Sequence, residues 1–228
     1  MFLTTGITPS LSKALGVGGA FVSALLASTS LHAEPVPEDF AERVDALMET
    51  SFEADGPGAV VVVAKDGEVI YRGVRGMADI KDDIPVKAET VFRYASITKQ
   101  FAAATMLKLA EQGRLSLDDP LSKYLPEYPA PGRDVTLAQR LNHTSGIKSY
   151  TSIPGWMTRE NTSRAVTTSE LVSVFADQPV DFPAGTQFRY NNSGYVLVGA
   201  VIEAVTGEPW YEAMIEEVTG SLAIPTIT

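Results

Sequence analysis

Residues 91–101 read Val-Phe-Arg-Tyr-Ala-Ser-Ile-Thr-Lys-Gln-Phe, which places Ser96 three positions before Lys99. Alanine-rich helical spacing follows as far as Gly113, a residue typical of a helix C-terminus, so the stretch predicts a helix from Ser96 to Gly113. Residues three apart share a helix face, so the hydroxyl and the amine are expected to meet. The segment therefore predicts a nucleophile at a helix N-terminus, where the helix dipole favours developing negative charge.

The amine of Lys99 is the predicted base. A serine hydroxyl is a weak nucleophile until a neighbouring group takes its proton, and a lysine amine can take it where burial lowers the pKa of the amine. The apolar neighbours expected to provide that burial are Phe92, Ile97 and Phe101. The simpler alternative is that Ser96 caps the helix and Lys99 is an exposed side chain one turn later.

The Ser-x-x-Lys pattern occurs three times and is a weak signal by itself. Ser10–Lys13 lies in an apolar N-terminal segment. Ser145–Lys148 contains Gly146 and follows His-Thr, which predicts a loop rather than a helix. A second pattern supports the middle match. Tyr190-Asn-Asn192 is the single Tyr-x-Asn among eight tyrosines, in a turn before a helix predicted from Ser193 to Thr206.

Each residue of the Tyr-x-Asn pattern has a candidate role. A tyrosine beside a lysine can relay a proton to a leaving group, and the Asn192 side chain can hold an amide of a substrate. The alternative is that Tyr190 is buried for packing and that an asparagine caps the helix.

The remaining pattern predicts an N-terminal helix, a hairpin and a helical region. Apolar residues from Phe40 to Met48 share one helix face. Two β-rich runs, Gly58–Ala64 and Glu68–Gly73, flank Asp66-Gly67, which predicts a hairpin. The first run is wholly apolar, so we expect a helix on each face of the sheet.

The region after Gly113 predicts short helices separated by turns. Thr136 is expected to cap a helix that ends at Asn142, and Ser169 a second one that ends at Ala176. Phe182–Thr186 reads as a turn. Gly207 is expected to close the helix from Ser193, and Pro209 to start another. This order lacks the repeated βαβ units of a doubly wound sheet.

The N-terminus predicts export. Lys13 precedes an apolar run over residues 14–27, and Ala33 is a candidate cleavage site, so residues 1–33 read as a signal peptide of a secreted or periplasmic protein. A membrane anchor or a disordered N-terminus is the alternative; the apolar run is short for a span. Cleavage removes one lysine and no acid, which changes the formal charge from −10 to −11. An acidic chain of this kind is not expected to bind nucleic acid or anionic membranes.

The composition also limits the chemistry. The chain has no cysteine, and His143 is the one histidine outside the predicted signal peptide, so we expect no metal site and no cofactor. No Gly-x-Ser-x-Gly elbow is present, so an α/β-hydrolase, which would need His143 near a serine, is poorly supported.

Four segments resemble, in order, the serine β-lactamase and penicillin-binding D,D-peptidase superfamily, which includes class C β-lactamases and family VIII esterases. They are residues 91–101, Glu111–Pro120, Leu141–Gly146 and Phe182–Tyr195. The resemblance implies an α/β (α+β) fold of the β-lactamase/transpeptidase type, with an antiparallel sheet, flanking helices and a helical subdomain. It further implies one hydrolase domain over residues 34–228, with the hairpin and nucleophile helix in 34–113 and a helical region in 114–228.

By the same resemblance, Ser96 is acylated, Lys99 is the base, Tyr190 is the proton shuttle and Asn192 contacts a substrate amide. The substrate would be a D-Ala-D-Ala peptide, a β-lactam or a small ester. His143 and Ser145 match a loop of the family that is mainly structural, so no catalytic role is expected for them.

One departure concerns the third motif of the family, a Lys-Thr-Gly or His-x-Gly triad on a late strand. After Arg189 the sequence has no Lys, Arg or His. We therefore expect that the C-terminal strands are missing and that this chain has little hydrolytic activity. The alternative of another class is a non-catalytic binding module that recognises peptidoglycan peptides or a partner protein.

Overall fold

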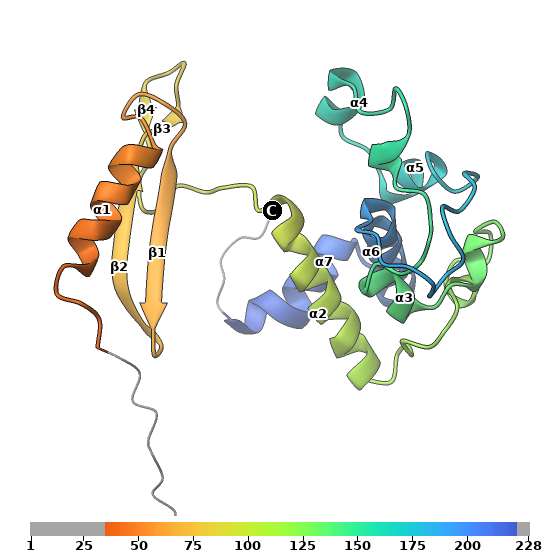
Figure 1. Cartoon of the computed structure of the whole chain (residues 1–228). Coiled ribbons are helices and arrows are strands. Elements are labelled where there is room, and N and C mark those ends of the chain that lie inside the picture. Colours follow the sequence, from red (N-terminus) through yellow and green to blue (C-terminus); the bar gives the residue numbers. More distant parts are fainter. Residues whose placement is uncertain (1–34, 223–228) are drawn as a thin grey trace, which may run out of the picture. The chain divides into compact units, whose positions relative to one another are not determined.

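The computed structural model describes residues 35–222. The predicted signal peptide, residues 1–33, lies outside the described residues. The chain divides into two compact units, residues 1–90 and 91–228. The first unit contains one helix and two antiparallel strand pairs among its described residues, and the second is helical (Figure 1).

The hairpin of the first unit forms as predicted. β1 (Ala59–Lys65) pairs with β2 (Glu68–Arg75) in antiparallel register, and a smaller pair joins β3 (Met77–Asp79) to β4 (Ile84–Pro85). Asp66 and Gly67 both have positive φ, 52° and 84°, which is the backbone of a two-residue hairpin turn that matches the strand twist.

One helix, α1 (Phe40–Ser51), packs against β2 in this unit. Met48 is buried there, and the Tyr71 hydroxyl donates to Asp45 Oδ1 at 2.5 Å. The buried face of α1 is narrower than predicted, because Leu47 is 64% exposed. α1 is the one helix among the described residues of this unit, so the expectation of a second helix on the other face of the sheet stays a prediction.

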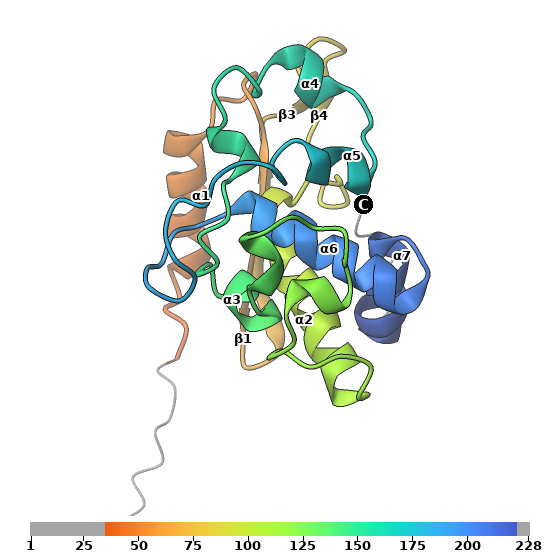
Figure 2. The ribbon, with the colours of Figure 1, turned by 90° about the vertical axis from the view of Figure 1, so that its right-hand side faces the viewer.

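The second unit is built around α6 (Asn192–Thr206), which packs against α2 (Thr98–Glu111), α3 (Leu137–Leu141), α5 (Thr168–Ser173) and α7 (Trp210–Met214) (Figures 1 and 2). A further short helix is α4 (Arg159–Ser163). Most residues from Ser193 to Ile202 are buried, so α6 is a core helix rather than an amphipathic surface helix.

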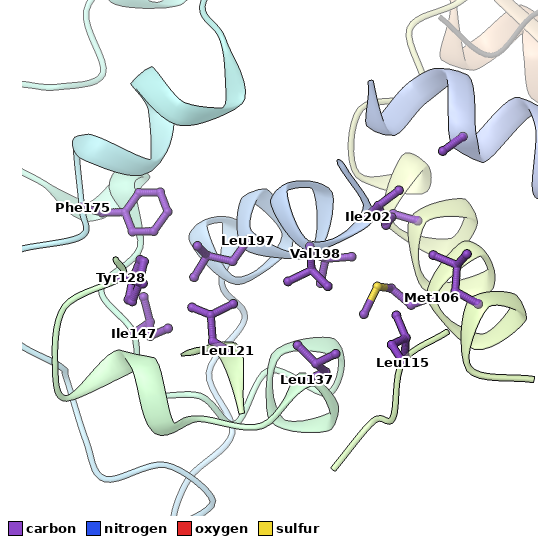
Figure 3. Packing of buried hydrophobic residues seen from close by; sticks show 14 residues of the cluster. Met106, Leu115, Leu121, Tyr128, Leu137, Ile147, Phe175, Leu197, Val198 and Ile202 are labelled. Atoms are coloured by element: carbon purple, nitrogen blue, oxygen red, sulfur yellow. The ribbon is translucent and has the colours of Figure 1, made fainter. Parts of the chain in front are cut away.

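The apolar core of the second unit joins α6 to α2 and α3. Figure 3 shows Leu197 beside Leu121, and Val198 close to Met106 and Leu137. Each fully buried side chain of this size contributes roughly 1.5–3 kcal/mol relative to an exposed one. This core holds α6 against α2, the helix that follows Ser96.

The helix ends follow most of the predicted signals. Gly113 has a φ of 71° and ends α2 with two backbone bonds, Gly113 N–H to the Ala110 carbonyl and Arg114 N–H to the Leu109 carbonyl. Thr136 caps α3 as expected, and its side chain accepts from Gln139 N–H. The predicted Ser169 cap is wrong.

Thr167, two residues earlier, caps α5. Its hydroxyl oxygen accepts from Glu170 N–H at 3.2 Å, and the Glu170 carboxylate accepts from Thr167 N–H at 2.7 Å. This reciprocal pair satisfies two backbone donors at once, which a cap at Ser169 would not. The N-terminus of α6 also differs by one residue from the prediction, because the helix starts at Asn192 and Asn191 is its cap.

Candidate active site

Ser96 lies in a single turn of 3₁₀-helix, Ala95–Ile97, that leads directly into α2. The hydroxyl is exposed at the N-terminus of the helix, as the sequence predicted. Ala95, the residue before it, has a φ of 46°, a backbone region that alanine rarely occupies. Such a conformation stores local strain and persists only where the surrounding structure enforces it.

The Ser96 hydroxyl meets Lys99 and Tyr190. Lys99 Nζ donates to Ser96 Oγ at 3.1 Å, one turn along the same helix, and the Tyr190 hydroxyl donates to Ser96 Oγ at 2.7 Å. Lys99 Nζ also donates to Asn192 Oδ1 at 2.9 Å. The four residues singled out from the sequence therefore converge on one serine oxygen and one ammonium group.

Asn191 and Asn192 make different contacts, one as a helix cap and the other with Lys99. Asn191 caps α6, because its Oδ1 accepts from Gly194 N–H at 2.8 Å and its Nδ2 donates to the Ile147 carbonyl. Asn192 turns to the site, with Oδ1 on Lys99 and Nδ2 donating to Thr151 Oγ1 at 3.3 Å. The alternative reading is therefore right about a capping asparagine but wrong about Tyr190, which is 48% exposed, and the contact of Asn192 with a substrate amide stays a prediction. Sequence reasoning missed Thr151, which no motif marks.

Lys99 is surrounded differently from the expectation. Phe92 and Ile97, two of the three apolar neighbours named to bury the amine, are 40% and 48% exposed. Lys99 Nζ lies instead 4.9 Å from the centre of the Tyr190 ring and 5.7 Å from that of Tyr195. Aromatic faces attract a cation through their negative quadrupole, so they favour an ammonium at this position.

The electrostatic effect of this arrangement appears at Tyr190. Burial raises the pKa of the Tyr190 phenol, but the interaction with the Lys99 side chain, the hydrogen bond with Ser96 and the charge of Lys99 together outweigh burial and lower that pKa. A lowered pKa makes the phenol a better proton carrier near neutral pH.

The other Ser-x-x-Lys matches do not form this pair. Ser145 is buried in a loop, where its Oγ accepts from Ile147 N–H at 3.4 Å. Lys148 Nζ is directed to Asp181 Oδ1, at 2.9 Å, and not to Ser145. Ser10–Lys13 lies outside the described residues.

A cavity of about 320 Å³ is lined in part by Ala95 and Thr98, which lie on either side of Ser96 in the sequence. Its polar wall includes Lys99 and Asn192, and much of the remainder is apolar. The apolar side chains that close it include Ala95, Leu171 and Trp210. A few polar groups in an apolar pocket are typical of a small-molecule site.

Two kinds of arrangement are absent from residues 35–222, the part of the chain that the structure describes. No group of three or more acidic, histidine or cysteine side chains in that range has an arrangement that could hold a metal ion. No helix in it is both long enough and apolar enough to span a membrane.

The comparisons with known proteins identify the lineage. The Beta-lactamase family profile matches residues 40–226, so the chain belongs to this family. Esterase EstB of Burkholderia gladioli is 34% identical over 183 residues, which cover 74% of this chain and 46% of the esterase. Penicillin-binding protein 4* of Bacillus subtilis is 30% identical over 169 residues, covering 73% of this chain and 36% of that protein.

Solved structures agree. A D-stereospecific amidohydrolase from Streptomyces sp. matches with a TM-score of 0.62 and 35% identity, over 73% of this chain and 49% of that one. The octameric penicillin-binding protein homologue from Pyrococcus abyssi matches with a TM-score of 0.68 and 31% identity, over 81% and 42%. The fold is therefore that of β-lactamases and penicillin-binding proteins, and the lineage is one of serine hydrolases. The chain spans less than half the length of these four proteins.

Proposed function

We propose that this chain carries the nucleophile and base of a serine hydrolase that forms an acyl-enzyme on Ser96. The observation that supports this most directly is the pair of hydrogen bonds that Ser96 Oγ accepts from Lys99 Nζ and the Tyr190 hydroxyl. A helix cap with a solvent-directed lysine would need neither contact. The substrate class is that of the family's relatives: a D-Ala-D-Ala peptide, a β-lactam or a small ester.

In the reactive form of the site the Lys99–Tyr190 pair has lost one proton, and it takes the Ser96 proton as Oγ attacks the substrate carbonyl carbon. The positive end of α2 and the Lys99 ammonium favour the negative charge that develops there. When the tetrahedral intermediate collapses, the bond to the leaving group breaks and Tyr190 returns the proton to it. The same pair, which has now given up that proton, takes one from a water molecule that attacks the acyl carbon. When this second intermediate collapses, the bond between the acyl carbon and Ser96 Oγ breaks and the proton returns to Oγ, which releases the acid product.

Asn192 supports both groups in this scheme. Its Oδ1 holds the Lys99 ammonium, and its Nδ2, held by Thr151 Oγ1 in the free protein, is a donor that a substrate carbonyl can take over. The substrate's acyl or leaving group would lie in the adjacent cavity, whose apolar wall favours uncharged groups.

Covalent labelling tests the proposal. A fluorophosphonate or a fluorescent penicillin should tag the wild-type chain, and Ser96→Ala should abolish the tag. Lys99→Ala should slow labelling by roughly 10²–10⁴-fold, the range for loss of a general base. Ser145→Ala is the matched control, because it removes a hydroxyl from the same Ser-x-x-Lys pattern at a site whose lysine pairs elsewhere.

The outcomes separate the main proposal from its rival. Labelling that persists without Ser96 but is lost without Ser145 would show that the nucleophile was chosen wrongly. Reversible binding of a penicillin or a stem peptide, with no covalent tag, would support a non-catalytic binding module.

A further inference from the structure

His143 holds the backbone on both sides of Tyr190. Its main-chain carbonyl accepts from Arg189 N–H at 3.0 Å, and its Nδ1 accepts from Asn191 N–H at 3.2 Å. The histidine lies just beyond α3 with a φ of 63°, a backbone region in which asparagine, aspartate and histidine are enriched. His143 thus fixes the backbone of Arg189 and Asn191, which lie on either side of Tyr190.

The imidazole also packs directly on the aromatic side chains of the site. Its centre lies 4.7 Å from that of Tyr190, 5.2 Å from that of Tyr195 and 5.9 Å from that of Phe188. The same two tyrosines contact the Lys99 ammonium. A displacement of the imidazole would therefore be transmitted to the rings between which Lys99 is held.

The Asn191 bond requires a particular protonation state of the imidazole. Nδ1 can accept an N–H only while it carries no proton, so the proton of the neutral ring lies on Nε2. Burial, and then the charge of Lys99, lower the pKa of His143. The titratable groups that face the ring are Lys99 of α2, Tyr190 before α6 and Tyr195 of α6, and none of them is an anion that would favour the imidazolium.

We propose that His143 is a positioning residue of the reaction, whose neutral imidazole holds the Arg189–Asn191 backbone so that the Tyr190 hydroxyl stays hydrogen-bonded to Ser96. Protonation of Nδ1 breaks the hydrogen bond from Asn191 N–H and frees this backbone to move. The inference rests on the proposed function of Ser96, Lys99 and Tyr190. A shift of about 1 Å in a catalytic group can cost about 10²-fold in rate, so a modest loosening is enough.

The conservative variant His143→Asn separates positioning from bulk packing. Asparagine also tolerates a positive φ, and its Oδ1 can accept from Asn191 N–H at any pH. His143→Leu fills much of the same space with an apolar side chain and removes the acceptor. We expect the fluorophosphonate labelling rate of His143→Asn at pH 7.5 to exceed that of His143→Leu by roughly 10–10²-fold.

The pH profile of labelling gives a readout that a merely structural role would not change. In the wild-type chain, the logarithm of the labelling rate should fall with falling pH at a slope of one, because the catalytic base becomes protonated. Below the pKa of His143 the slope should increase to two, because His143 becomes protonated as well. In His143→Asn the slope should stay at one. Equal rates for the two variants, a wild-type slope that stays at one, or a slope of two in His143→Asn would overturn the proposal.

A measurement independent of catalysis covers the case in which His143→Leu does not fold. Two-bond ¹H–¹⁵N spectra of the 228-residue chain should show His143 with an unprotonated Nδ1 at pH 7.5 and a titration midpoint below about 6.5, the ordinary value for histidine. The chain has two histidines, and the His143 signal is the one that His143→Asn removes. A proton on Nδ1, or a midpoint at or above the ordinary value, would contradict the inference.

Failure of the proposed function has a different signature. A wild-type chain that is not labelled, or that is labelled equally after Ser96→Ala, refutes the proposed function and the positioning role together. Labelling that depends on Ser96 but not on the acceptor at position 143 refutes the positioning role alone.

Discussion

Gly146 joins the loop that carries His143 to the segment that leads into Tyr190. Its φ is 70°, its carbonyl accepts from Asp181 N–H at 2.7 Å, and an added Cβ would collide with the Phe182 carbonyl oxygen. Two costs therefore meet at one residue, a left-handed backbone and a close approach of two main chains. Only glycine avoids both.

We expect Gly146→Ala to destabilise the protein more than Gly113→Ala does. Gly113 has nearly the same φ, 71°, but nothing lies within 4 Å of an added Cβ. The control should therefore lose roughly 1–3 kcal/mol of unfolding free energy from the backbone alone. Gly146→Ala should lose roughly a further 1–3 kcal/mol from the collision. Urea denaturation measures both, and equal losses would show that the Phe182 carbonyl moves away freely.

At the scale of elements, short helices are placed by their caps and by one buried cation. Arg140 belongs to α3, and its fully buried guanidinium donates to the Gly132, Val135 and Thr136 carbonyls, which anchors the helix to the preceding segment. Burial lowers the pKa of Arg140 to about 10, a cost that these three acceptors offset in part. α5, which contributes Leu171 to the cavity beside Ser96, depends instead on the reciprocal bonds of Thr167 and Glu170.

The cap of α5 gives a prediction with a control two residues away. Thr167→Ala should reduce the free energy of unfolding by roughly 0.5–2 kcal/mol, because Glu170 N–H loses its acceptor. Ser169→Ala, at the position that the sequence suggested for the cap, should change it by less than about 0.5 kcal/mol. Thermal unfolding of the two variants compares them directly. A larger loss of unfolding free energy for Ser169→Ala would show that Ser169 is the cap.

At the scale of the whole molecule, the acidic charge and the N-terminal pattern concern where the protein works. The formal charge of −10 agrees with a small-molecule or peptide substrate and opposes polyanionic partners. We propose that the protein is exported, on the basis of the basic residue and apolar run within residues 1–33. An extracytoplasmic location is where D-Ala-D-Ala peptides and β-lactams would be encountered.

N-terminal sequencing of the protein from a secreting host checks export. The mature chain should begin near Glu34, since Ala33 precedes the predicted cleavage site. Replacing the apolar run over residues 14–27 with a polar sequence is the control and should leave an uncleaved protein in the cytoplasm. A cytoplasmic wild-type protein that begins at Met1 would contradict the proposal.

Much of this protein was determined by residues that are close together in the sequence. The Asp66-Gly67 turn, the Gly113 helix end and the approach of Ser96 to Lys99 all depend on contacts within about one turn. Backbone conformational preferences and hydrogen bonds over such short separations favour the same local structure in many surroundings. These local patterns were therefore enough to predict the hairpin and the helix that follows Ser96. The choice of Ser96 among the three Ser-x-x-Lys matches also needed the Tyr190–Asn192 pattern and the family resemblance.

Tertiary structure alone decided the choices between residues of similar local character. Packing of α6 on α2 brings Asn192 to Lys99 across 93 positions of sequence, and it leaves Asn191 as the cap. It also turns Lys148 away from Ser145 and places His143 against Tyr190. These contacts cannot be predicted from local sequence, because they arise from the burial of apolar side chains that different segments contribute to one core.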